Sequence, residues 1–161
     1  MIFTKPPCFR EFLSGDVNEL AFLLADNIPG RYFSYLKEPE FLSDVEAHLR
    51  SWCNDEKVGL FRSFHLLKEK DEGTMLEKWG IDNTTCFLKV IQNVMNALLV
   101  GLYDTLPIDT DTISYSKLAV KYSAKEVIDL LEVLESHITM LGVKGRYTAN
   151  DYLNLVMKLA V

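Results

Sequence analysis

Histidine and cysteine are the residue types in this chain best suited to metal binding, proton transfer or nucleophilic attack. The three histidines, His48, His65 and His137, lie far apart in the sequence. Helical metal sites place a second His or Cys within a few residues of the first, and none of the three has such a neighbour. Asp44 shares a helix face with His48, but pairs at this spacing are far more often solvated contacts than half of a metal site. The histidines therefore predict no metal site.

The three cysteines, Cys8, Cys53 and Cys86, are scattered and lack CxxC spacing. A free thiol with a histidine elsewhere in the chain could suggest a thiol hydrolase. Cys53 and Cys86 fall on the apolar faces of expected helices, which favours small core residues instead, and Cys8 allows no assignment. An odd number of unpaired cysteines is typical of a reduced protein of the cytoplasm, which is where we expect this one.

Nucleotide hydrolysis would require a glycine-rich loop followed by Lys and Ser or Thr, because backbone amides must surround phosphates that the lysine neutralises. The chain has no GxxxxGK[ST] segment, and residues 142–145 (GVKG) are interpreted as a turn between helices. The sequence thus predicts no catalytic, cofactor-binding or metal residues and no enzyme activity. A small all-α enzyme stays open as an alternative, which would need two histidines and a carboxylate to converge on one pocket.

Charge and aromatic content argue against direct nucleic-acid binding. The formal net charge of −6 disfavours attraction to DNA or to an anionic membrane. Aromatic side chains could stack on bases if basic residues were densely interleaved with them, which they are not, so packing in a core or an interface is favoured. These aromatic residues are Tyr32, Phe33, Tyr35, Trp52 and Trp79. A solvated face explains the basic residues of the C-terminal third, Lys117, Lys121, Lys125, Lys144 and Arg146.

The elements that would position these residues are all expected to be helices. Apolar residues recur at three- and four-residue steps, and no segment alternates as a strand would. The fold class predicted is all-α, a compact domain of about seven to nine helices, and 161 residues with 48% hydrophobic content suffice for a core. No apolar run approaches the ~18 residues of a membrane span, and the nearest covers residues 94–102.

The N-terminal half predicts four helices. Asp16 and Glu19 have the spacing of a capping box for the first, which carries Leu20, Leu23 and Leu24 and ends at residues 27–30. A short aromatic helix covers residues 31–37. The next covers residues 39–53, with Pro39 in its first turn and a buried face formed by Phe41, Leu42, Val45, Leu49 and Trp52. A further helix carries Val58, Phe61, Phe64 and Leu67.

The C-terminal half predicts a central helix and a closing helical pair. A short helix over residues 75–79 ends at Gly80, and a cap among residues 82–85 starts the central helix over residues 86–103. After a polar connection at residues 106–112, a short helix covers residues 114–121. Ser123 opens a long helix that ends at Gly142 and carries Val127, Leu130, Leu131, Leu134, Ile138 and Leu141. Thr148 starts the last, with Tyr152, Leu153, Val156, Met157 and Ala160.

Three segments of this predicted series of helices resemble the C-terminal region of bacterial DNA polymerase III clamp-loader subunits of the delta-prime or gamma/tau type. Residues 12–24 (FLSGDVNELAFLL) look like the end of an AAA+ lid domain. Residues 87–99 (FLKVIQNVMNALL) are similar to the central helix of the collar domain. Residues 116–119 (SKLA), 123–141 and 148–161 resemble its closing pattern of a short helix, a long helix, a turn and a final helix.

The resemblance implies two regions: residues 1–30 as a short helical segment from the end of a lid domain, and residues 31–161 as a helical collar-like domain. It implies a non-catalytic scaffold in DNA replication that packs against other clamp-loader subunits and meets DNA only through the complex. It implies no membrane, cofactor or small-molecule substrate. The family's phosphate loop and its Ser-Arg-Cys segment have no counterpart here, and residues 145–147 (GRY) stand where the family often has an Asn.

Collar domains bind their neighbours through apolar surface, so the resemblance places candidate interfaces at residues 31–36 and on the final helix. The alternative is a free-standing helical adaptor or regulatory protein, of phage or mobile-element origin, that binds a protein partner with the same helices.

Overall fold

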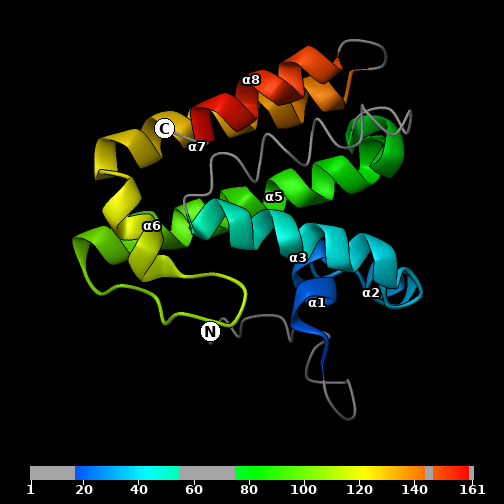
Figure 1. The fold of residues 1–161 in the computed structure, drawn as a ribbon, viewed down its shortest axis with the longest axis horizontal. Coiled ribbons are helices and arrows are strands. Elements are labelled where there is room, and N and C mark those ends of the chain that lie inside the picture. Colours follow the sequence, from blue (N-terminus) through cyan, green and yellow to red (C-terminus); the bar gives the residue numbers. More distant parts are fainter. Residues whose placement is uncertain (1–16, 55–74, 144–146, 160–161) are drawn as a thin grey trace, which may run out of the picture.

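The structure is a computed structural model that describes residues 17–54, 75–143 and 147–159, and all of its regular elements there are helices (Figure 1). The prediction of an all-α fold with about seven to nine helices is confirmed by the seven found in these ranges. They are α1 (Glu19–Ala25), α2 (Pro29–Leu36), α3 (Pro39–Cys53), α5 (Met75–Tyr103), α6 (Tyr115–Lys121), α7 (Ala124–Leu141) and α8 (Ala149–Leu159).

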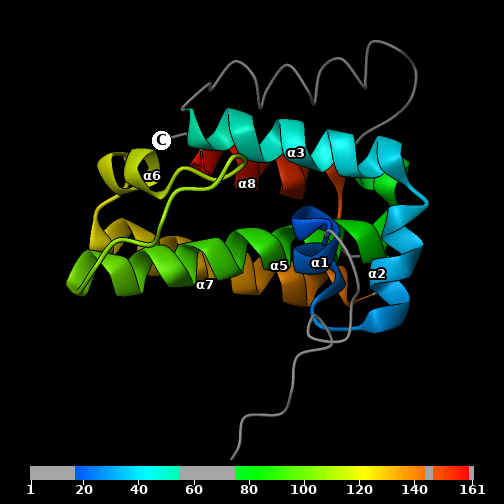
Figure 2. The same cartoon turned by 90° about the horizontal axis from the view of Figure 1, so that it is seen from below.

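Helix α5 is the centre of the fold, as predicted. It contacts α7 most extensively and also contacts α1, α6 and α8. The four longest helices, α3, α5, α7 and α8, run side by side, with α2 at one end and α6 at the other (Figures 1 and 2). Apolar side chains from all four fill one continuous core, in which those fully enclosed include Leu49, Leu88, Met95, Leu98, Leu134, Leu141 and Leu155.

Helix α5 also has the length and composition of a membrane-crossing helix between Trp79 and Tyr103, with a mean hydropathy of 1.4 in its most apolar window. The expectation that no apolar run approaches this length is wrong by this measure, because isolated polar residues such as Asn96 lower the mean only slightly. Half of that window is buried inside the protein, and the core helix of a soluble protein meets the same criterion.

Gly80 interrupts α5 as predicted, but the helix resumes earlier than expected. Gly80 has φ 81° and ψ 169°, which only glycine adopts without strain. Residues 82–85, the expected cap, lie inside the resumed helix. The hydroxyls of Thr84 and Thr85 donate to the carbonyls of Gly80 and Ile81, both at 2.8 Å. Because these hydroxyls bond to carbonyls of the preceding turn, polar residues can lie inside the helix. The expected start of the central helix at residue 86 is therefore wrong.

Two other helix starts also differ from expectation. The cap of α1 is Asn18, whose side-chain oxygen accepts from the amide of Ala21 at 3.0 Å. Asp16, the expected cap, lies outside the described residues. Helix α2 begins at Pro29 rather than at residue 31, because proline fits the first turn of a helix. The predicted division between residues 30 and 31 falls within α2, and the assignment of a lid segment and a collar stays a prediction.

The predicted buried face of α3 is confirmed, and of the face predicted for α7, Val127, Leu130, Leu134 and Leu141 are buried while Leu131 and Ile138 are partly buried. Every residue expected on the α3 face is buried, and Pro39 is in its first turn. Ser123 and Glu126 form a reciprocal cap at the start of α7, each bond 3.2 Å long. In α8, Tyr152 and Val156 are buried as expected, whereas Met157 is 54% exposed. The predicted helix carrying Val58 to Leu67 lies outside the described residues.

The connection between α5 and α6 is held closely against α5. A Cβ added to Gly101 would lie 2.4 Å from Cδ of Pro107, so the chain returns over the helix where a side chain is missing. Ile113 then enters the core. The Asp109 carboxylate accepts from the amide and hydroxyl of Ser116, at 3.0 and 2.7 Å, and so holds the first turn of α6. These bonds lower the pKa of Asp109.

Candidate functional site

The two histidines that the structure describes, His48 and His137, are buried. His48 is buried between the rings of Trp79 and Phe87, and its Nδ1 lies 2.7 Å from the backbone carbonyl oxygen of Asp44. The expectation of a solvated contact between the side chains of Asp44 and His48 is therefore wrong. His137 is also buried, with Nδ1 2.8 Å from the Tyr147 hydroxyl. His65 lies outside the described residues, among which no group of three His, Cys, Asp or Glu could hold a metal ion.

Cys53 and Cys86 are core residues, as predicted. The Cys53 sulfur accepts from the amide of Ser114 at 3.5 Å, and the Cys86 sulfur accepts from the Arg31 guanidinium at 3.8 Å. Burial raises the pKa of the Cys53 thiol, which keeps it protonated, whereas nucleophilic cysteines need a lowered pKa. Cys8 lies outside the described residues.

Most of the described aromatic residues pack in the core, and two of the lysines form hydrogen bonds. Trp52, Trp79, Tyr32 and Tyr35 are buried, which agrees with the prediction of core packing, while Phe33 is exposed. Two lysines of α6 reach the end of α3. Lys117 donates to Asn54 Oδ1 at 2.7 Å, and Lys121 donates to the carbonyl of Trp52 at 3.2 Å. Lys125 is exposed as expected, and Lys144 and Arg146 lie outside the described residues.

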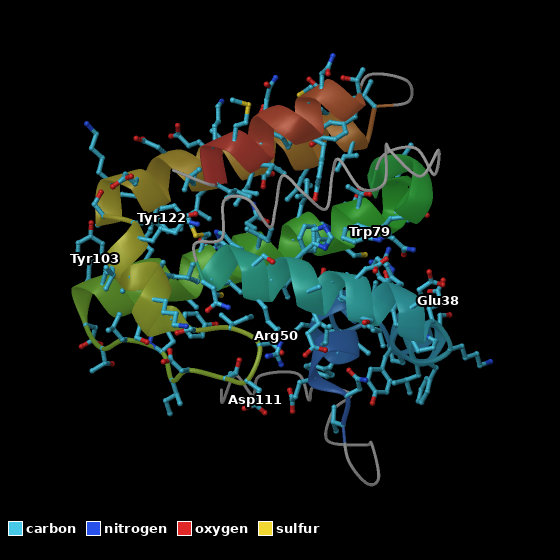
Figure 3. All side chains as sticks on the ribbon, viewed as in Figure 1. Glu38, Arg50, Trp79, Tyr103, Asp111 and Tyr122 are labelled. Carbon is cyan, nitrogen blue, oxygen red and sulfur yellow. The ribbon has the colours of Figure 1, made fainter. Side chains whose placement is uncertain are left out.

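The most exposed apolar residues around the end of α5 form what we call the α5-end surface, made of Val100, Tyr103, Leu106 and Ile108. They are 67%, 72%, 48% and 88% exposed. Val100 and Tyr103 lie on one face because they are three residues apart on α5. Leu106 and Ile108 belong to the connection that returns over Gly101. Tyr103 extends from the end of the bundle opposite Glu38 (Figure 3).

The expected interface residues divide between core and surface. In residues 31–36, Phe33 and Leu36 are exposed, at 51% and 42%, while Tyr32 and Tyr35 are buried in the core. In α8, most described apolar residues are buried and Met157 is the exposed one. The α5-end surface was missed by sequence reasoning. The sequence did contain a sign of this surface, because Val100 and Tyr103 are apolar residues that fall outside the apolar stripe of the central helix.

A second candidate is a cavity of about 370 Å³, which we call the corner cavity, where α2 turns into α3 beside the start of α5. Phe41 and Trp79 form its aromatic wall, with their ring centroids 5.2 Å apart at a near-right angle. The remaining lining residues are polar or lie at the turn, and they are Lys37, Glu38, Pro39, Glu40, Asp44 and Asn83. Asn83 is held in place because its Oδ1 accepts from the Tyr35 hydroxyl at 3.2 Å.

Comparisons with known protein families, with curated proteins and with solved structures give no match to this chain. The resemblance to clamp-loader subunits therefore stays a prediction, and the site must be interpreted from its own chemistry. The described residues offer buried histidines and thiols together with exposed apolar side chains.

Proposed function

We propose that this chain is a non-catalytic helical domain that binds other proteins, and that it serves as a collar-like scaffold in a clamp loader of DNA replication. The observation that carries the proposal is the α5-end surface. Four large apolar side chains around one helix end are costly to expose to water, and such groups on soluble proteins mark binding sites for partners. The clamp-loader assignment rests on the resemblance of residues 12–24, 87–99, 116–119, 123–141 and 148–161.

The placement of the histidines and thiols supports a role without chemistry. His48 and His137 are enclosed by aromatic neighbours, and the pKa of the buried Cys53 thiol is raised. A general base or nucleophile needs a reactive atom in contact with substrate and a pKa matched to its task. The net charge of −6 supports contact with DNA only through other subunits.

The test is co-purification of the tagged chain from a lysate of its native host, with mass spectrometry of the retained proteins. The proposal predicts that clamp-loader subunits or the replicative polymerase are recovered. Recovery of unrelated proteins, without any replication factor, would contradict the clamp-loader assignment and favour the free-standing adaptor. Absence of any retained protein, together with no self-association at high concentration, would contradict the binding role itself.

A further inference from the structure

The connection between α5 and α6 extends the α5-end surface towards α1. Tyr103 at its start and Asp111 at its far turn lie well apart (Figure 3). Where the far turn meets α1 there is a cavity of about 380 Å³, whose apolar lining includes Leu20, Leu23 and Ile113. The α5-end surface and this cavity together form what we call the connection surface, which is elongated and apolar at both ends.

The backbone of the connection is held in place without a partner. The close packing of Pro107 on Gly101 fixes its start against α5. Two hydrogen bonds close its far turn. The amide of Thr110 donates to the carbonyl of Ile113 at 2.9 Å, and the amide of Ile113 donates to the Thr110 hydroxyl oxygen at 3.0 Å. A surface that is already ordered loses little conformational entropy when it binds a partner.

The charges beside these apolar side chains are all negative. Residues 100–113 contain three aspartates, Asp104, Asp109 and Asp111, and no lysine or arginine. All three aspartates are exposed. The described residues that line the cavity include two carboxylates and no basic side chain. Lys117 and Lys121, on the helix that follows, bond to the end of α3. The connection surface therefore complements apolar groups that are accompanied by positive charge.

This combination discriminates between classes of partner. Nucleic acid and anionic lipid would be repelled by the aspartates. In a symmetric dimer the same patch of each copy faces its counterpart, so a second copy of this chain would bring like charges together. A different protein with lysines or arginines beside its apolar side chains meets no such penalty.

We propose that the connection surface binds a segment of a protein partner in which bulky apolar side chains are flanked by lysines or arginines. Apolar side chains of the segment cover the α5-end surface, and one of them enters the cavity beside α1. Its basic side chains lie next to Asp104 and Asp111. The inference rests on the proposed binding role and names the chemistry of the partner at that surface.

The test is an NMR titration of the full chain, labelled with ¹³C at the δ1 methyl groups of isoleucine. Ile108, which is 88% exposed, reports on the connection surface, and Ile128 on α7 is the reference. Ile108→Val and Ile128→Val variants assign the two signals. The probe is a helical peptide of about 18 residues with leucines on one face and lysines along both borders of that face. A second peptide has glutamates in place of the lysines, and a third has alanines in place of the leucines.

We expect the lysine peptide to shift the Ile108 signal saturably and to leave Ile128 in place. The other two peptides should bind at least about tenfold more weakly, because each lacks one half of the complementary chemistry. An Asp104→Asn/Asp111→Asn variant should bind the lysine peptide about two- to thirtyfold more weakly, as expected for two exposed charge pairs. Glu38→Gln/Glu40→Gln removes as many charges at the opposite end of the bundle (Figure 3) and should leave the affinity measured at Ile108 unchanged.

Three results would overturn the inference: an Ile108 signal that the lysine peptide does not move, equal binding of the lysine peptide and either of the other two, or equal loss of affinity in the two charge variants. Equal binding of the lysine and glutamate peptides would identify a purely apolar surface instead. Because the titration uses no protein from the host, its failure would remove the proposed partner chemistry alone, and co-purification tests the binding role separately.

Discussion

Trp52 Nε1 donates a hydrogen bond of 2.8 Å to the hydroxyl oxygen of Tyr122, 70 residues later in the chain. The Tyr122 hydroxyl in turn donates to the backbone carbonyl of Leu159. All three groups are buried, and they belong to α3, to the junction of α6 with α7, and to the end of α8. One phenol oxygen thus connects three distant parts of the chain at the same point of the core.

Replacing Tyr122 with Phe should therefore destabilise the protein. The change keeps the ring but leaves the Trp52 indole N–H and the Leu159 carbonyl without their partner in the core. The expected loss is about 1–3 kcal/mol in the free energy of unfolding. Urea denaturation followed by tryptophan fluorescence measures it. Tyr103→Phe is the matched control, because Tyr103 is 72% exposed and its change should cost less than about 0.5 kcal/mol. Equal midpoints for Y122F and wild type would contradict the bonding scheme.

Two glycines in helices should respond oppositely to alanine. At Gly101 the new Cβ would meet Pro107 Cδ at 2.4 Å and Leu106 Cα at 2.9 Å, which forces the connection away from α5. The expected result is a destabilisation of about 1–3 kcal/mol. At Gly30 in α2 no atom lies within 4 Å of the new Cβ, and helix propensity should stabilise the protein by up to about 1 kcal/mol. Thermal unfolding distinguishes them, and a G101A protein as stable as G30A would disprove the close approach.

Burial of His137 should make stability depend on pH. Burial lowers the pKa of His137, Asp151 partly opposes this by raising it, and Lys158 lowers it further. The pKa in the folded state thus lies below the unfolded value of about 6.5. At pH values between these two pKa values, the unfolded chain binds more protons at His137 than the folded protein does. The free energy of unfolding should therefore fall as the pH drops from about 6.5 towards the folded pKa.

The measurement for His137 is urea denaturation at a series of pH values. A His137→Asn variant should show a smaller loss of stability over that window than wild type, whatever its stability at neutral pH. Comparing the slopes removes the contributions of the other histidines. Identical slopes would show that His137 titrates alike in both states.

Helix positions were predictable where one physical signal dominated. The stripe of Val127, Leu130 and Leu134 fixed the face of α7, and Gly80 marked a break that its positive φ explains. Errors arose where two local signals competed. Asn18 caps α1 although Asp16 has the capping-box spacing, and Thr85 sits inside α5 with its hydroxyl bonded to a carbonyl of the previous turn. Single-sequence patterns do not rank such alternatives, because tertiary contacts decide between them.

The candidate sites were harder to predict because they depend on distant residues meeting. The corner cavity joins Glu38 and Phe41 to Trp79 across a long separation in sequence, which no local pattern encodes. His48 has the spacing of an exposed partner of Asp44, yet Trp79 and Phe87 enclose it. The exposed side chains of Val100 and Tyr103 could have been found, since both lie off the apolar stripe of a helix predicted to be central.

Binding of a protein partner by the α5-end surface can be measured by quantitative co-purification with a surface variant. Val100→Ser/Tyr103→Ser removes exposed apolar area, and Ile128→Ser on α7, where the side chain is 42% exposed, is the control away from this surface. We expect the double variant to stay folded and to retain at least about tenfold less of the partner per bait molecule, whereas the control should retain as much as wild type. Equal retention by the double variant and wild type would contradict binding at this surface.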